Sequence, residues 1–552
     1  MPTFLVSGDN KKLNNLKNIT FIPNNIKYNY AKLLKIAGNA CDNKFYILGK
    51  RLNFENNYSQ DIKYAWELSR LYHTPALAKV YLKTQDKKYL NYLINNINSW
   101  IDNNPFLTGV NWINPMEVSI RAINLIYVFN YLKDNKNISD KFWVKLINNL
   151  YLHKIYIENN WEIYYKNNNH YLADLLGAFY LNLLFNNKNK IKIYKKLLSE
   201  FDKQFLPDGT NYEGSTCYHK LSTQMFLHFY YLCKKINLKL NNKLLIKLKR
   251  ATKFIKLNKI NKKDYLQIGD NDSGKILHGF RLNDYWMLKR VQHDKKENQN
   301  SCHPAPVRTE RSRSANHKTL FHYKNFGLTI IKNNNYHITY RHPTYNKNQP
   351  TGHFHQDELS VTLAYNNSPI IIDPGTYLYT GNIKARNLFR SYKSHSAFNY
   401  AQARNSGISS LFTLNKQEQK DTSVIKKNKN KYLIKNYFKN NNIKIIRQLL
   451  FDTDKDKIVL IDKVEGFITE SQLNFIFHPD IKIKKINNNI FEITDKNNNI
   501  FEFKSTLNFC TQKHYYSSAY GKIRKCTKLI SSEILTTQNI KTTITKLNTA
   551  KA

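Results

Sequence analysis

Three histidines and one aspartate in the second half of the chain could form a metal site beside a catalytic group. They are His353, His355, Asp373 and His395, and the first two lie only two residues apart. The run 358–365 alternates apolar and polar residues, which predicts a half-buried strand directly after these two histidines. In a strand, residues two apart point to the same face, about 6 to 7 Å apart, so both imidazoles would serve one pocket. Imidazoles and a carboxylate with an open position are ligands that Zn²⁺ accepts.

Spacing alone does not decide for a metal. The chain has 17 histidines, and a histidine in a strand is more often a hydrogen-bonded core or surface residue than a ligand. Histidine and aspartate ligands at long spacings are also less specific than paired Cys-x-x-Cys motifs. The spacing by itself therefore favours ordinary structural histidines.

The apolar pattern divides the chain into a helical half and a β half. From about residue 62 to about 290, apolar residues recur at spacings of three and four, which predicts stacked amphipathic helices. After about residue 318 the runs alternate with a period of two, as in 336–341, which favours an antiparallel β-sandwich. A chain of 552 residues is also too long for one ordinary core. We therefore expect an α+β multidomain protein, with domains over 1–290 and 318–552.

The segment between the two halves has a composition of its own. Residues 291–317 include prolines, serines and clustered arginines, and they show no apolar period. We interpret this segment as a flexible basic insertion at the domain junction. A polyanion-binding loop built on Arg308, Arg311 and Arg313 is the alternative.

Several segments, in order along the chain, resemble motifs of the heparinase II/III family of polysaccharide lyases. In the second half these are HFHQDELSVTLAYNNSPIIIDPGTYLY and RNLFRSYKSHSAF. In the first half they are YAWELSR, NPFLTGVNWINPMEVSIRA, NNNHYLADLLGAFYL and DGTNYEGSTCYH. The resemblance runs from about residue 60 to about 480. It implies an incomplete α/α toroid before the sandwich, and an enzyme that cleaves an acidic, uronate-containing glycan by β-elimination. Heparin or heparan sulfate-like and alginate-like chains are the substrates it suggests.

The resemblance also implies which residues carry the chemistry. β-Elimination removes a weakly acidic proton beside a carboxylate and expels the sugar oxygen on the next carbon, so the carboxylate's charge must be neutralised. Asn169 matches the family position that binds this carboxylate, although it could simply cap the following helix. His170 matches a position in the same cleft, where we expect it to position substrate or stabilise charge.

Tyr218 and His353 match the acid/base pair of the family. An unperturbed tyrosine has a pKa of about 10, so action as a base at neutral pH requires nearby positive charge. We expect His353 and local lysines to supply it. Tyrosine could also return its proton to the leaving oxygen as a general acid.

His355, Asp373 and His395 match the metal-binding positions of the family. The resemblance implies one structural Zn²⁺ per chain, which would tie the strands and loop together behind His353 and orient it. One departure is Ser396, where the family commonly has Asn after the last histidine.

A further set of residues near these motifs could hold the sugar. For the two tryptophans a core position is as good an explanation, and Glu117 with Arg121 could form an ion pair at helical spacing. Arg386 and Arg390 are better candidates for carboxylate or sulfate, because arginine offers a planar pair of donors. The set comprises Trp66, Asn111, Trp112, Glu117, Arg121, Arg386 and Arg390.

Composition adds little to the choice of partner. The formal net charge is +46, but the lysines are spread evenly together with Asn, Ile and Tyr, so we expect no nucleic-acid partner and mostly solvated surface. The six scattered cysteines predict free thiols. We expect an acidic polysaccharide as substrate and no transmembrane segment. A homodimer is possible. The resemblance implies a cell-envelope or periplasmic location, whereas no signal peptide is visible at the start, and the cytoplasm is the alternative.

Two other functions compete with a lyase. A glycoside hydrolase on an α/α toroid would need two carboxylates flanking the cleaved bond, for which Asp208 and Glu213 are a candidate pair. A non-catalytic glycan-binding or envelope-assembly protein could keep the fold. The retention of Tyr218, His353 and Asn169 together argues against lost chemistry.

Overall fold

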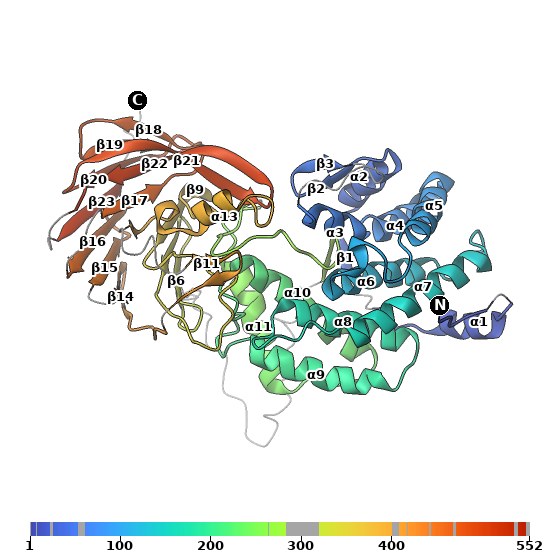
Figure 1. Cartoon of the computed structure of the whole chain (residues 1–552). Helices are drawn as coiled ribbons and strands as arrows, with labels where there is room; N and C mark the ends of the chain where they lie inside the picture. The colour runs from blue at the N-terminus through green and yellow to red at the C-terminus, as the bar shows by residue number, and fades with distance from the viewer. Residues whose placement is uncertain are drawn as a thin grey trace, which may run out of the picture.

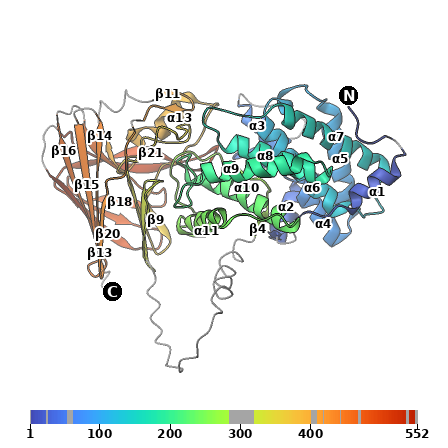
Figure 2. The same ribbon diagram turned by 90° about the horizontal axis from the view of Figure 1, so that it is seen from below.

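The computed structural model consists of a helical domain and a β domain that lie side by side (Figures 1 and 2). It describes residues 2–6, 8–22, 26–52, 61–262, 264–282, 319–399, 408–416, 418–440, 443–466, 471–534 and 539–547. The expected insertion at 291–317 and the expected domain boundaries near 290 and 318 lie outside these residues. No helix in the described ranges has both the length and the apolar character needed to cross a bilayer.

The helical domain is an incomplete α/α toroid built from helix hairpins. Its centre is formed by α6 and α8, most of whose residues are buried. The two helices approach closely at Gly177, where an added Cβ would lie 2.5 Å from the Cβ of Ser119. The helices are α1 (Asn10–Asn18), α2 (Tyr30–Cys41), α3 (Lys63–Ser69), α4 (Thr74–Thr84), α5 (Lys87–Asn103), α6 (Pro115–Leu132), α7 (Asp140–Asn159), α8 (Asn169–Leu184), α9 (Asn189–Gln204), α10 (Thr216–Lys235) and α11 (Asn242–Leu257), with a 3-10 turn η1 at Val110–Trp112.

Short paired strands also belong to this domain. The strand β1 (Ile26–Tyr28) pairs with β4 (Phe280–Leu282), and β2 (Phe45–Ile47) pairs with β3 (Lys50–Leu52). The β1–β4 pair joins the N-terminal part of the chain to the segment that follows α11. That segment, 264–282, runs along the junction with the β domain.

The β domain contains antiparallel sheets that enclose a second core. One sheet has the order β5-β6-β7-β8-β9, another has β13-β14-β15-β16-β23-β20-β19-β18, and a third has β10-β17-β22-β21. The strands of the first sheet are β5 (Leu320–Tyr323), β6 (Leu328–Lys332), β7 (Tyr336–Arg341), β8 (Val361–Tyr365) and β9 (Ser368–Ile371). The others are β10 (Phe398–Asn399), β13 (Val424–Asn428), β14 (Lys431–Asn440), β15 (Ile443–Asp452), β16 (Lys457–Glu465), β17 (Gln472–Ile476), β18 (Lys482–Lys485), β19 (Ile490–Thr494), β20 (Ile500–Ser505), β21 (Phe509–Ala519), β22 (Lys522–Ser531) and β23 (Ile540–Lys546), with a hairpin of β11 (Ile408–Ser410) and β12 (Thr413–Leu414).

Burial in these sheets follows the strand period of two. Along β15 buried and half-buried residues alternate without exception, and its apolar side chains Ile445, Leu449 and Phe451 join the sandwich core. The helix α13 (Ile383–Arg390) lies between β9 and β10 in sequence, beside the junction with the helical domain (Figure 1).

The predicted placement of the histidine motif on a strand is wrong. The strand β8 begins only at Val361, and residues 353–357 form an irregular loop before it. Leu359 has a φ of 61°, a left-handed conformation that breaks the extended chain between the motif and the strand. His353 and His355 are therefore positioned by contacts with the other domain rather than by strand pleating.

Candidate active site

Tyr218 and His353 come from different domains and stack on each other. Tyr218 lies in the first turn of α10, where the Ser215 hydroxyl caps the helix by accepting from the Cys217 and Tyr218 backbone N–H groups. The Tyr218 and His353 rings lie 3.5 Å apart between centroids and 14° from parallel. The Tyr218 hydroxyl also forms a 3.3 Å hydrogen bond with the hydroxyl of Tyr379. The two predicted acid/base groups are thus brought into direct contact.

The environment of Tyr218 keeps its phenol protonated. Burial raises the pKa of Tyr218 well above 10, and the nearby carboxylates of Asp272 and Asp270 raise it further. The prediction that positive charge lowers the pKa of Tyr218 is therefore wrong for this structure. A neutral phenol is suited to donate a proton.

Asn169 is held by a buried carboxyl group. It is the first residue of α8, and the cap of that helix is the preceding Asn168. The Asn169 side-chain NH₂ donates to Glu213 Oε2 at 2.7 Å, and its backbone N–H donates to Oε1 at 3.1 Å. The same Glu213 Oε2 lies 3.6 Å from His353 Nε2. Burial raises the pKa of Glu213, so this group is less acidic than an ordinary glutamate.

His170 brings a second titratable group close to Asn169. Its Nδ1 lies 3.0 Å from Glu162 Oε1, and its side chain is 32% exposed. Burial alone would lower the pKa of His170, but Glu162 and the more distant Asp174 raise it above its ordinary value. These carboxylates therefore favour the protonated form of His170 relative to a free imidazole.

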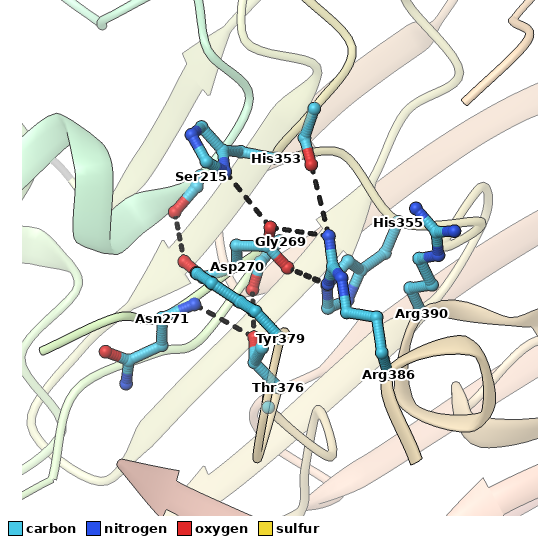
Figure 3. A network of polar contacts seen from close by, with 12 residues as sticks. Ser215, Gly269, Asp270, Asn271, His353, His355, Thr376, Tyr379, Arg386 and Arg390 are labelled. Atoms are coloured by element: carbon cyan, nitrogen blue, oxygen red, sulfur yellow. Dashed lines mark hydrogen bonds and ion pairs between the residues drawn. The ribbon is translucent and has the colours of Figure 1, made fainter. Parts of the chain in front are cut away.

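Asp270 connects His353, the predicted catalytic histidine, to His355, one of the predicted metal ligands (Figure 3). His353 Nδ1 lies 3.0 Å from Asp270 Oδ2, and His355 Nε2 lies 2.9 Å from Oδ1. Burial would raise the pKa of Asp270, but Arg386 and the two imidazoles hold it well below its ordinary value. Asp270 is not among the residues predicted from the sequence. A signal was present in the segment IGDNDSG, where acidic residues stand between two glycines in a loop without apolar period.

The three predicted metal ligands lie together in the interior of the β domain. Atoms of His355, Asp373 and His395 that could bind one ion all lie within 4.8 Å of one another. Two ring nitrogens of this cluster, His355 Nδ1 and His395 Nε2, are buried and have no hydrogen-bond partner among the described residues. His395 Nδ1 lies 2.9 Å from Asp373 Oδ2. Unpartnered buried nitrogens beside a carboxylate fit a divalent cation.

The sugar-binding candidates of the helical domain mostly serve its interior. Trp112 packs among aromatic side chains and donates to the Asn104 carbonyl at 3.1 Å, and Asn111 donates to the Asn104 side chain. Arg121 is fully buried and donates to His153, Ser69 and the Asn111 carbonyl. Trp66, whose side chain is half-buried, donates to the Val110 carbonyl at 3.0 Å. A sugar contact stays a prediction for this group, and Trp66 is its most accessible member.

The expected ion pair between Glu117 and Arg121 is replaced by a tertiary one. Both carboxylate oxygens of Glu117 accept from Arg70, at 2.5 and 2.6 Å. Arg70 also pairs with Glu67. Arg70 therefore pairs both with Glu67 at helical spacing and with Glu117 of α6, so Glu117 is paired across helices rather than with Arg121.

Arg386 and Arg390 are also used inside the protein. Arg386 is fully buried and forms a two-pronged ion pair with Asp270. Arg390 donates to the carbonyls of Ser410 and Leu411 and to the side chain of Asn387. In this structure neither guanidinium is free to bind a substrate carboxylate or sulfate.

The candidate hydrolase pair has no shared role. Asp208 accepts from the backbone and hydroxyl of Thr210 and from the backbone of Asn325. Glu213 instead faces Asn169 and His353. The two carboxylates therefore serve different contacts, which does not favour a hydrolase.

A groove lies between the two domains, and its lining does not include Asn169, Tyr218 or His353. Its volume is about 900 Å³, and its walls include Asn167, two residues before Asn169, and Gln349, four residues before His353. Such a volume can hold several sugar rings. The cationic side chains along it are Lys166, Lys203, Lys324 and Lys420.

Comparison with known protein families accounts for most of the chain. Residues 15–262 match the model of the heparinase II/III N-terminus, and residues 315–545 match the model of the heparinase II/III-like C-terminal domain. The chain belongs to the heparinase II/III family. Among curated proteins, the heparin-sulfate lyase of Pedobacter heparinus is 25% identical over 205 residues, which are 35% of this chain and only 30% of that protein.

Solved lyase structures share the fold over nearly the whole chain. A crystal structure of heparinase III superposes with a TM-score of 0.74 at 17% identity, covering 98% of this chain and 89% of that one. A mutant of the heparan sulfate lyase HepC from Pedobacter heparinus gives a TM-score of 0.61 at 18% identity, covering 94% and 84%. Chondroitinase AC lyase gives 0.56 at 11% identity, covering 98% and 82%. The toroid and the sandwich therefore occur in the arrangement that the resemblance implied.

Proposed function

We propose that this protein is a polysaccharide lyase that cleaves a uronate-containing glycosaminoglycan by β-elimination. The observation that carries the proposal is the direct stacking of Tyr218 on His353 across the domain junction, beside Asn169 and Glu213. The names of similar proteins, a heparin-sulfate lyase and a chondroitinase, support this class of substrate.

The positions of the side chains suggest a division of labour. His353 has its Nδ1 engaged by Asp270, which leaves Nε2 to accept the proton beside the substrate carboxylate. Tyr218 keeps its proton, so it would donate to the leaving sugar oxygen. The two rings are already in contact, and a substrate would enter beside their edges rather than between them.

Asn169 and its neighbours would neutralise the substrate carboxylate. The Asn169 side-chain oxygen is buried and has no hydrogen-bond partner among the described residues. Glu213 holds the other end of this amide. The second N–H of the amide could donate to the sugar carboxylate, and its free oxygen could accept from the protonated form. His170, whose pKa is raised, would add favourable charge when protonated.

The predicted metal is proposed to be a structural Zn²⁺. His355, Asp373 and His395 would hold it, with the two unpartnered imidazole nitrogens as ligands. When bound, the ion would cross-link the loop before β8 to the segments after β9 and α13, and so fix the position of His353. About one zinc per chain is expected by elemental analysis, and a content near zero after purification without chelators contradicts the assignment.

The lyase proposal is tested by the product. Purified protein is incubated with heparin, heparan sulfate, chondroitin sulfate and alginate, and the ultraviolet absorbance of unsaturated uronate is followed. Elimination creates a carbon–carbon double bond conjugated to the carboxylate, whereas hydrolysis gives reducing ends without this absorbance. Reducing ends without absorbance favour the hydrolase, and no cleavage of any acidic glycan refutes the proposal. Cell-envelope location and a homodimer stay predictions, to be tested by fractionation and by light scattering.

A further inference from the structure

Asp270, in the helical domain, contacts the proposed catalytic histidine, His353, in the β domain. It lies in the loop after α11, and it is fully buried. Its backbone N–H donates to the His353 carbonyl at 3.0 Å, and its own carbonyl accepts from the Ser215 hydroxyl at 2.5 Å. An added Cβ at the preceding Gly269 would lie 2.5 Å from the His353 carbonyl oxygen. The loop and the histidine segment are thus fitted tightly together.

The Asp270 carboxylate, which comes from the helical domain, accepts from three side chains of the β domain at once (Figure 3). One oxygen faces His353 Nδ1 and Arg386 Nη2, at 3.0 and 2.7 Å. The other faces His355 Nε2 at 2.9 Å and Arg386 Nη1. An ionised carboxylate has no hydrogen to donate, so each facing imidazole nitrogen must carry the proton.

This requirement places the protons of the two histidines on opposite ring atoms. A neutral His353 carries its proton on Nδ1, which leaves Nε2 as the basic nitrogen on the side of Glu213. A neutral His355 carries its proton on Nε2, which leaves Nδ1, the buried nitrogen without a partner, to face His395 and Asp373. One carboxylate therefore selects a different tautomer in each ring.

We propose that Asp270 is a positioning residue that sets both tautomers, making His353 a base toward the cleft and His355 a ligand toward the metal site. Arg386 holds the carboxylate by two parallel hydrogen bonds, which fixes its plane and orients one oxygen toward each imidazole. The inference rests on the proposed lyase function and on the proposed metal site. It explains why the family-matched Arg386 is buried rather than exposed to the sugar.

The test is Asp270→Asn, which keeps the shape but replaces one acceptor oxygen with an NH₂ group. Whichever way the amide turns, one imidazole then meets a donor and must take the other tautomer. If the NH₂ group faces His353, Nδ1 must accept and Nε2 carries the proton, so the cleft loses its basic nitrogen. Turned toward His355, the NH₂ group places a proton on the metal-facing nitrogen. We expect kcat to fall by about 10²-fold with KM changed less than about threefold, or the zinc content to fall below about half.

Asp462→Asn is the matched control. Asp462 is also fully buried and bound by an arginine, with Arg447 Nε and Nη2 at 2.6 and 3.2 Å, but no histidine contact to it is found in the described residues. The Asp462→Asn variant loses the same kind of ion pair but changes no histidine tautomer. Retention of both kcat and zinc in Asp270→Asn, or equal losses in the two variants, overturns the inference.

A second measurement needs no substrate and reads the tautomers in the wild-type protein. Solid-state NMR of ¹⁵N-histidine-labelled wild-type protein at about pH 8, where ordinary imidazoles are neutral, distinguishes the protonated ring nitrogen. We expect His353 protonated on Nδ1 and His355 on Nε2, with signals assigned through His353→Gln and His355→Gln. Protonation of His353 on Nε2 refutes the inference even if a glycan is cleaved. Correct tautomers without any cleavage refute the lyase function alone.

Discussion

Replacing Tyr218 with phenylalanine separates proton transfer from packing. The substitution keeps the ring that stacks on His353 at 3.5 Å and removes a hydroxyl whose hydrogen-bond partner is Tyr379 at 3.3 Å. Loss of one such bond costs about 0.5 to 1.5 kcal/mol of folding stability. Loss of a general acid lowers kcat by about 10² to 10⁴, which corresponds to about 2.7 to 5.4 kcal/mol in the barrier. The catalytic effect should therefore exceed the effect on stability.

The assay combines kinetics with thermal unfolding. Initial rates of absorbance increase give kcat and KM on the glycan that is cleaved, and circular dichroism gives the melting temperature. Tyr379→Phe is the control, because it removes the same hydrogen bond from the other side. We expect it to lose less than about tenfold in kcat. If Tyr218→Phe keeps a rate within about threefold of wild type, or if the two variants lose equally, Tyr218 is not the proton donor.

Other predictions concern the remaining groups of the site. His353→Ala and Asn169→Ala should each lower kcat by about 10²-fold or more while the far-ultraviolet spectrum stays unchanged, because they remove base and charge stabilisation. His355→Ala should contain less than about half the zinc of wild type by elemental analysis, and an unchanged content would contradict its role as a ligand. His170 has a raised pKa, so its charge is present below that pKa and is lost as the pH rises through it; kcat/KM should fall over that range. In Glu162→Gln the fall should move to lower pH, and an unmoved profile would exclude His170 as the titrating group.

The fold was accessible from the sequence because its periods are local. The spacing of three and four in the first half and the alternation in the second each arise within a single element, and the alternating run at 336–341 corresponds to β7 (Tyr336–Arg341). The motif resemblance added the order of the domains and the candidate residues. The loop before β8 was misassigned because the left-handed Leu359 interrupts an otherwise regular alternation.

The electrostatics of the site could not be predicted in this way. The pKa of Tyr218 is raised by burial and by Asp270 and Asp272, which follow it by about fifty residues and reach it only after folding. Likewise, helical spacing suggested that Glu117 pairs with Arg121, whereas the fold gives it Arg70 from another helix. Patterns within one element do not report charges that another element brings.

The site is assembled from residues of both domains. The β domain supplies His353, His355 and Arg386, and the helical domain supplies Tyr218 and Asp270. The Asp270 carboxylate accepts hydrogen bonds from all three of these β-domain side chains. In the described residues the proposed base and the proposed proton donor come from different domains. Docking of the domains would therefore complete the proposed acid/base pair, and it buries an arginine–aspartate pair that would be costly to leave unpaired. Catalytic competence and domain docking should therefore be lost together when this junction is broken.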